Sequence, residues 1–137
     1  MIYNIHFGAQ NDSYPKGVIM LVTVLKSKIH MATVTEAELL YEGSITVDAD
    51  LIKEVGLIPG ELVHVLNFDN GERFETYIIE GSAGSGIIGL RGPAARKGKI
   101  RDRIIIASYA MMDEDDAKKF KSKVILLDEK NRIKKKK

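Results

Sequence analysis

The sequence contains a succession of short segments with the alternating or continuous apolar pattern of β-strands, and this pattern limits the fold classes open to the chain. Turn-forming residues separate each segment from the next, and no long helical pattern alternates with them. Such a sequence favours a small, closed or nearly closed barrel over a parallel sheet flanked by helices, and therefore predicts a mainly β fold. The predicted strands are Val18–Ile29, Ser44–Val47, Leu62–Phe68, Arg73–Ile79, Ile87–Leu90, Ile104–Met111 and Lys123–Leu127.

Local turn and capping residues add detail to this pattern. Asn70-Gly71 lies between two predicted strands and supplies the positive φ angles that a tight hairpin needs. Asp48 and Asp113 are each placed to cap a short helix, and acidic residues follow Asp113 where the helix dipole favours them. Thr35–Leu40 has the polar character of a helix-like turn. We thus expect strands with few and short helices.

Length and composition indicate one folded domain. A chain of 137 residues with 45% hydrophobic residues can bury one sizeable core. The absence of cysteine excludes disulfides, thiolate chemistry and cysteine-ligated zinc. No run approaches the roughly 20 apolar residues of a membrane-spanning helix, and the first residues lack the pattern of a secretory signal. We therefore expect a cytoplasmic protein with no membrane partner.

The two ends differ in character from the middle of the chain. Residues 1–19 are rich in turn formers and predict a flexible N-terminal extension, or an over-extended reading frame whose true start is Met20. Residues 20–127 form the predicted barrel domain, and 128–137 form a basic C-terminal tail. Without the four lysines Lys134–Lys137, seventeen basic residues face nineteen acidic ones, which changes the net charge from +2 to −2. We expect this lysine run to be solvated and disordered.

Three sequence patterns suggest a functional site, but each has a simpler structural explanation. Gly84-Ser85-Gly86-Ile87-Ile88-Gly89 matches a dinucleotide-binding pattern, but the residues that follow cannot begin a helix, so a connection between strands is favoured. The histidines His6, His30 and His64 lack metal-ligand spacing, and we predict no metal. By spacing alone, Gly43-Ser44 is an ordinary turn.

A basic series gives the main alternative function. Clustered cations can bind a phosphate backbone, which allows a non-enzymatic β-barrel module that binds nucleic acid through Arg91 to Arg103. Aromatic residues that could stack on bases are missing from the series, so a solvated loop is favoured and no nucleic-acid partner is expected. The series consists of Arg91, Arg96, Lys97, Lys99, Arg101 and Arg103.

Several separated motifs resemble one family in their order and spacing. From about Met20 to about Leu127, the chain is similar to the aspartate 1-decarboxylases. The motifs are Lys28-x-His30-x-x-x-Val34-Thr35, Tyr41-Glu42-Gly43-Ser44, Asn70-Gly71-x-Arg73-Phe74-x-Thr76-Tyr77, Gly92-x-Ala94-Ala95 and Ile105-Ile106-Ala107-Ser108-Tyr109.

The resemblance implies a six-stranded double-psi β-barrel that assembles as a homotetramer with its sites between subunits. It implies that the chain cuts itself between Gly43 and Ser44, and that Ser44 becomes a pyruvoyl group. This cofactor forms a Schiff base with L-aspartate and accepts the electrons released with CO2, giving β-alanine for pantothenate biosynthesis. The sequence leaves open whether a maturation factor takes part.

The resemblance also assigns roles to individual residues. Tyr77 would donate a proton, and Thr76 would bind substrate and polarise the Gly43 carbonyl during cleavage. Arg73 and Lys28 would bind substrate carboxylates. The backbone of Gly92, Pro93 and Ala94 would form a substrate-binding stretch.

Two positions depart from the family pattern, and one distance requires explanation. Arg91 stands where the family usually has Asn, and Pro93 replaces an Ala. In a regular strand, Arg73 and Tyr77 share one face but lie roughly 13 Å apart. Either long side chains and a bulge bring them together, or neighbouring subunits share the pocket.

Overall fold

The computed structural model describes residues 15–137, and the predictions for residues 1–14 lie outside this range. Strands dominate the described chain, which confirms a mainly β fold with short helices. The strands are β1 (Leu21–Thr33), β2 (Glu36–Glu38), β3 (Ser44–Asp48), β4 (Leu62–Asn67), β5 (Arg73–Gly81), β6 (Ile88–Arg91), β7 (Arg103–Asp113), β8 (Lys123–Leu127) and β9 (Ile133–Lys136). The helices are α1 (Ala49–Glu54), the 3-10 helix η1 (Gly92–Arg96) and α2 (Glu114–Lys119).

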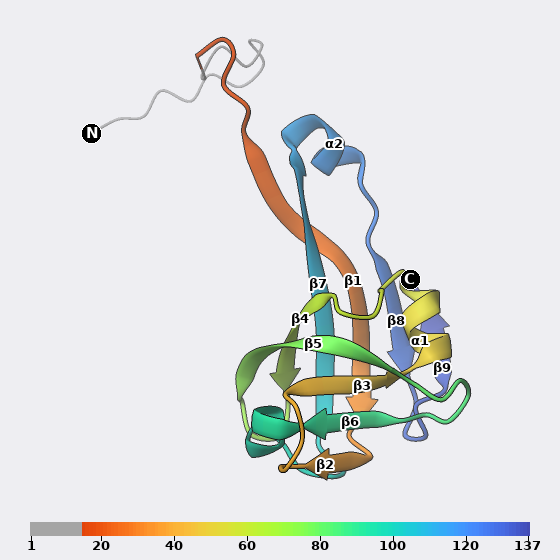
Figure 1. Ribbon diagram of the computed structural model, residues 1–137. Helices are drawn as coiled ribbons and strands as arrows, with labels where there is room; N and C mark the ends of the chain where they lie inside the picture. The colour runs from red at the N-terminus through yellow and green to blue at the C-terminus, as the bar shows by residue number, and fades with distance from the viewer. Residues whose placement is uncertain (1–14) are drawn as a thin grey trace.

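The strands form one sheet that curves around a core. Their order is β2-β6-β3-β5-β4-β7-β1-β8-β9, so six consecutive strands from β6 to β1 make its centre, while β2, β8 and β9 are added at its edges. The two ends of this central set approach each other, because the Thr35 amide just after β1 donates to the Ile88 carbonyl in β6 at 2.8 Å. Figure 1 shows these strands wrapped together in the lower part of the molecule.

Alternation along the central strands places one face of each in the core. In β4, Val63 and Val65 are fully buried, while Leu62 is exposed. Ile45 and Val47 of β3 are also fully buried, and Ser44 and Thr46 lie on the opposite face of that strand, where they are buried as well. Burial of these aliphatic side chains supplies the main stabilising term of the barrel.

Both predicted helix caps are present. The Asp48 carboxylate accepts a hydrogen bond from the Asp50 amide at 2.9 Å, and α1 buries Leu51 and Ile52. The Asp113 carboxylate accepts one from the Asp116 amide at 2.9 Å at the start of α2. In both cases a side chain satisfies an amide that the helix itself leaves without a partner.

Two expectations are wrong. Thr35–Leu40 contains strand β2, which pairs parallel with β6, rather than a helix-like turn. The C-terminal lysines form strand β9, paired antiparallel with β8, rather than a disordered end. Asn131 fixes this segment, because its side-chain amide donates to the Gly86 carbonyl at 2.7 Å and its carbonyl oxygen accepts from the Thr33 amide at 2.8 Å. Tertiary hydrogen bonds therefore outweigh local composition at both places.

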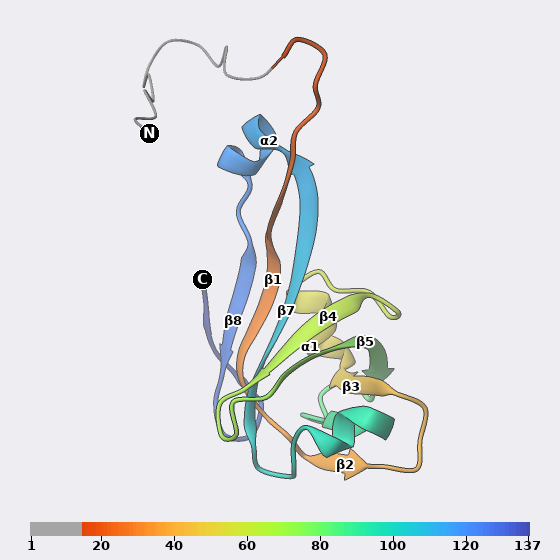
Figure 2. The ribbon, with the colours of Figure 1, turned by 90° about the vertical axis from the view of Figure 1, so that its left-hand side faces the viewer.

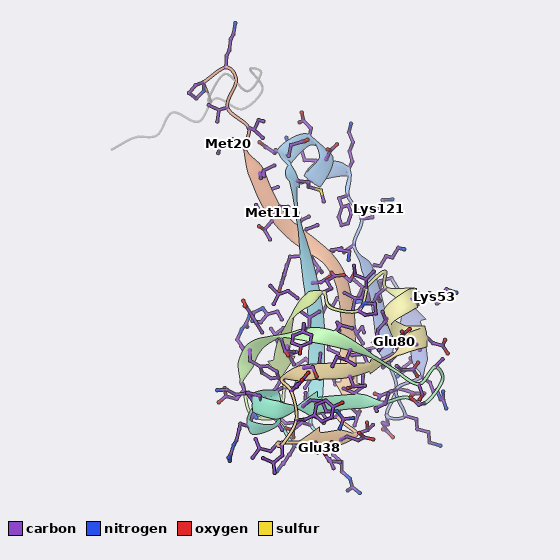
Figure 3. The ribbon with its side chains drawn as sticks, in the orientation of Figure 1. Met20, Glu38, Lys53, Glu80, Met111 and Lys121 are labelled. Atoms are coloured by element: carbon purple, nitrogen blue, oxygen red, sulfur yellow. The ribbon has the colours of Figure 1, made fainter. Side chains whose placement is uncertain are left out.

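The outer parts of β1 and β7 extend beyond the barrel as a two-stranded arm, with α2 at its tip (Figures 1 and 2). Leu21 pairs with Asp113 at the far end of this arm. Figure 3 shows Met20 and Met111 on the arm, away from Glu38 at the opposite end of the molecule. The arm exposes apolar side chains, including Leu21 at 54% and Met111 at 66%. Such a surface is typical of a contact with another chain.

Candidate active site

The Gly43–Ser44 peptide lies where the loop from β2 enters strand β3. Ser44 is the first residue of β3 and is fully buried. Its hydroxyl lies 3.4 Å from the carbonyl oxygen of Glu42, to which it can donate. On one side β3 pairs with β6, where Arg91 is opposite Ser44, and on the other side it pairs with β5. The hydroxyl is therefore confined within the sheet rather than displayed on a mobile turn.

The predicted Gly92-Pro93 stretch packs directly against this peptide. Gly92 has a φ of +64°, and a Cβ atom at that position would lie 2.6 Å from the Tyr41 carbonyl oxygen and 2.9 Å from the Gly43 nitrogen. A Cβ atom on Gly43 would in turn lie 3.3 Å from Cδ of Pro93. Only glycine allows the two backbone segments to approach so closely at position 92.

The third residue of that stretch, Ala94, is oriented differently. It is 5% exposed and belongs to the hydrophobic core. Its carbonyl oxygen accepts from the Lys97 amide at 3.0 Å within η1. Its neighbour Pro93 carries no amide proton.

Tyr77 and Thr76 reach the same place from strand β5. β3 and β5 are parallel, with Ile45 paired to Ile78. Extending this register by one residue brings Ser44 opposite Tyr77, on neighbouring strands about 5 Å apart and on the face of the sheet turned away from the core. Thr76, the residue before Tyr77, points to the other face of β5 and pairs with the buried Val63 of β4. The register thus brings Tyr77 to the start of β3, with Thr76 next to it in the chain.

Lys28 and Arg73 share the outward face of the sheet but lie further away. Pairing runs from Glu75 of β5 to His64 of β4, from His64 to Ala107 of β7, and from Ala107 to Lys28 of β1. Three strand spacings therefore separate Lys28 from β5, or roughly 14 Å between main chains.

The pairing of β4 with β5 shows whether a bulge in β5 brings Arg73 closer to Tyr77. It is regular from Leu62 opposite Tyr77 to Leu66 opposite Arg73, so no bulge in this ladder shortens the distance between Arg73 and Tyr77. One described chain thus packs Gly43, Gly92 and Pro93 together and brings Tyr77 to the strand next to Ser44, while Lys28 and Arg73 stay apart from them.

Sequence reasoning missed the proximity of two side chains on this face. His64 Nδ1 lies 3.4 Å from the Tyr109 hydroxyl, across a small hollow of about 190 Å³ that Glu75 also lines. The alternation of Leu62–Phe68 places His64 on the outward face, but the pattern does not reveal that β7 brings Tyr109 beside it.

His30 is also close to Lys28 in the chain, on strand β1. Burial, together with the positive charges of Lys28 and Lys137, lowers the pKa of His30 below its ordinary value of 6.5. Its Nδ1 atom is buried without a hydrogen-bond partner among the described residues, and the ring contacts Phe68 edge to face at 5.7 Å. A neutral, packed imidazole is the state that this environment favours.

The glycine-rich segment is a connection, as expected. The Asp48 carboxylate accepts hydrogen bonds from the Gly84 amide at 3.0 Å and the Gly86 amide at 2.8 Å. A phosphate cradle would need those same amides, so this loop is already satisfied by a side chain of the protein.

Ion pairs neutralise half of the basic series. Arg91 pairs with Glu36 and Glu38, Lys97 with Glu72, and Arg103 with Asp69. Hydrogen bonds from the Arg103 amide and side chain lower the pKa of the Asp69 carboxyl. The pairing reduces the cationic surface on which the nucleic-acid alternative depends.

Residues 15–137 contain neither a metal-binding cluster nor a membrane-spanning helix. No group of three or more His, Asp or Glu side chains there could hold a metal ion. Across the same range, no helix has the length and apolarity needed to cross a bilayer.

Comparisons with known proteins agree on one family. The family model described as aspartate decarboxylase matches residues 20–134. The aspartate 1-decarboxylase of Chloroherpeton thalassium is 56% identical over 85% of this chain and 85% of its own length. That of Bacteroides thetaiotaomicron is 58% identical over 80% of this chain and 93% of its own, and that of Carboxydothermus hydrogenoformans is 53% identical over 83% and 90%.

A solved structure, the rationally designed protein mkDPBB_sym_86, superimposes with a TM-score of 0.43 at 15% identity, over 56% of this chain and 90% of that one. The family model and the relatives each cover well over two thirds of the chain. The chain belongs to the aspartate decarboxylase family, as its motifs predicted.

Proposed function

We propose that this protein cleaves itself between Gly43 and Ser44 and then decarboxylates L-aspartate to β-alanine and CO2. The observation that carries the proposal is the packing at the start of β3. There, the backbone of Gly43 packs against Gly92, and Ser44 begins a strand that pairs with β5, the strand of Tyr77. Membership of the aspartate decarboxylase family supplies the reaction class.

The proposed cleavage needs no second nucleophile. The Ser44 oxygen bonds to the Gly43 carbonyl carbon, the peptide C–N bond breaks, and the nitrogen takes up the hydroxyl proton, leaving an ester. Loss of the Ser44 α-proton then breaks the ester C–O bond and releases residues 1–43 with a carboxyl end. The dehydroalanine left at position 44 takes up one water and releases one ammonia, which gives the pyruvoyl group.

Features of the site support this course. Ser44 is fully buried, so bulk water is excluded from the ester and elimination is favoured over simple hydrolysis. Gly43 has no side chain to obstruct attack at its carbonyl. We assign Thr76, next to Tyr77 on β5, to polarising that carbonyl oxygen, a role of the oxyanion-hole type.

The pyruvoyl group, once formed, supplies an electron sink for the electrons of the departing carboxylate. Tyr77, beside position 44, carries a hydroxyl that can deliver the proton replacing CO2. The amide of Ala94 and the backbone of Gly92 can hold the substrate against the same peptide. Arg73 and Lys28 supply two positive charges for the two carboxylates of aspartate.

We further propose that neighbouring chains complete each site in a homotetramer. The distances of Arg73 and Lys28 from the other site residues support this arrangement, since one chain does not gather them all. The apolar arm, with Leu21 and Met111 exposed, offers a surface for such contacts. We place the protein in the cytoplasm and the barrel domain at residues 20–127.

A trapping experiment tests the proposed reaction. Purified protein is incubated with L-aspartate labelled in its α-carboxylate, and CO2 release is counted. In a parallel sample with uniformly labelled substrate, borohydride is added to reduce any carbonyl–amine adduct. The proposal predicts CO2 release and label fixed to the fragment that begins at residue 44, both lost in Ser44→Ala. No CO2 release from cleaved wild-type protein would refute the proposed function.

The same preparation tests the alternative and the need for a partner. Salt-dependent retention on nucleic acid by an uncleaved, inactive chain would favour the binding-module function. Cleavage that appears only when a cell lysate is added would show that a maturation factor is required.

A further inference from the structure

The Arg91 side chain is anchored more firmly than the others in its basic series. Its guanidinium donates to the Glu36 carboxylate at 2.6 Å and to the Glu38 carboxylate at 3.1 Å, both on β2. Its Nε atom donates to the Thr46 hydroxyl at 3.3 Å on β3. The side chain is only 12% exposed, so these charge-assisted hydrogen bonds are largely shielded from solvent.

Packing completes this arrangement above and below the guanidinium. The Tyr41 ring lies over it, with 5.4 Å between the guanidinium carbon and the ring centroid. On the sheet side lies Gly89, where a Cβ atom would come within 3.1 Å of the guanidinium. The group therefore occupies a slot between a glycine and an aromatic ring, a geometry that uses its planar shape.

Tyr41 links this cluster to the Gly43–Ser44 peptide. It lies two residues before Gly43, and its carbonyl oxygen is close enough to Gly92 to exclude a Cβ atom there. The Arg91 side chain thus contacts the Tyr41 ring, and the next residue, Gly92, contacts the Tyr41 main chain. Among the described residues, the hydrogen-bond partners of the guanidinium lie on β2 and β3 beside the peptide rather than on the peptide itself.

We infer that Arg91 is a positioning residue for self-cleavage: pinned by Glu36 and Glu38, it holds Tyr41 and so fixes the chain that enters the Gly43–Ser44 bond. This role rests on the proposed function. It also gives a physical reason for Arg at position 91, because a guanidinium can bridge two carboxylates and stack on a ring at once. An ammonium group can do neither with fixed geometry.

Two kinds of variant separate charge from geometry. Arg91→Lys keeps the charge but loses the planar group, and Gly89→Ala keeps every charge while its new methyl group displaces the guanidinium. Tyr41→Phe retains the ring, whereas Tyr41→Leu removes it. Arg103→Ala, which breaks the Arg103–Asp69 ion pair elsewhere on the barrel, is the matched control.

The first measurement is the rate at which the purified precursor yields the fragments 1–43 and 44–137, followed by intact mass. We expect Arg91→Ala, Arg91→Lys and Tyr41→Leu to slow cleavage by about tenfold or more, as the loss of a desolvated cation–π contact implies. Tyr41→Phe and Arg103→Ala should cleave at the wild-type rate. Normal cleavage by Arg91→Ala in a chain whose wild type cleaves would overturn the inference.

The second measurement does not depend on cleavage. In the uncleavable Ser44→Ala background, hydrogen exchange is compared with and without Arg91→Ala. The inference predicts faster exchange at residues 39–43 and unchanged exchange in the β4–β5 hairpin. Unchanged exchange at 39–43 would overturn the positioning role, whereas a wild-type chain that never cleaves would refute the proposed function instead.

Discussion

Replacing Gly92 with alanine perturbs the most crowded contact at the site. Gly92 adopts a φ of +64°, and its missing Cβ atom would lie 2.6 Å from the Tyr41 carbonyl oxygen and 2.9 Å from Cα of Gly43. These neighbours are backbone atoms of a loop that is fixed on both sides. The substitution therefore cannot be relieved by rotating a side chain.

The cost has two parts. Placing an L-residue in the left-handed region costs about 1–2 kcal/mol. Forcing a methyl group against backbone atoms, with the shift that follows, costs about 1–3 kcal/mol more. We therefore expect Gly92→Ala to lower the free energy of unfolding by about 2–5 kcal/mol, and to displace the Gly43 backbone and slow cleavage at Gly43–Ser44.

Gly60→Ala is the matched control for this prediction. Gly60 has a φ of +86° and no heavy atom within 4 Å of the added Cβ atom, so only the backbone term applies. Urea unfolding of both variants in the Ser44→Ala background, followed by circular dichroism, measures the difference without the complication of cleavage. Equal destabilisation of the two variants would contradict this prediction, because the contact with Tyr41 and Gly43 would then cost no free energy.

Two further predictions concern protons. Because burial and nearby lysines lower the pKa of His30 below 6.5, the folded state binds its proton less readily than the unfolded state. The stability linked to His30 should therefore be complete above pH 6.5 and decline as the pH falls below it; urea midpoints at about pH 7.5 and about pH 5.5 should differ less in His30→Gln than in wild type. Tyr77→Phe should leave cleavage intact and lower kcat for L-aspartate by about 100-fold or more, and an unchanged kcat in steady-state assays would remove Tyr77 from proton donation.

Local chemistry made much of the fold predictable. Asn70-Gly71 and the alternation on either side of it predicted the β4–β5 hairpin, which forms with a regular register. Asp48 and Asp113 predicted both α-helices, because an N-cap acts within a few residues of the chain. Features that depend on neighbours in sequence could thus be predicted.

Strands that depend on distant partners were missed. Glu36–Glu38 forms a strand beside β6, where Arg91 bridges the two glutamates, and no local pattern reveals that bridge. Ile133–Lys136 forms an edge strand despite its lysines, because Asn131 ties the preceding turn to the barrel. Lysines on an edge strand are compatible with pairing on one side and solvent on the other.

The candidate site also combines features that local sequence predicts with features that depend on distant residues. Spacing alone made Gly43-Ser44 an ordinary turn, and only the resemblance to a family drew attention to it. The proximity of Tyr77 to Ser44 follows from the pairing of Ile45 with Ile78, two residues that are far apart in the chain. Sequence periodicity gives the face on which a side chain lies, but not the strand that will lie next to it.

The most direct test of the account is the intact mass of the mature, active protein. We expect two chains, residues 1–43 and residues 44–137, whose summed mass equals the mass of the precursor plus one water and minus one ammonia. The second chain should react with a carbonyl reagent at its first residue. A single uncut chain that is fully active, or a second chain that still begins with serine, would contradict it.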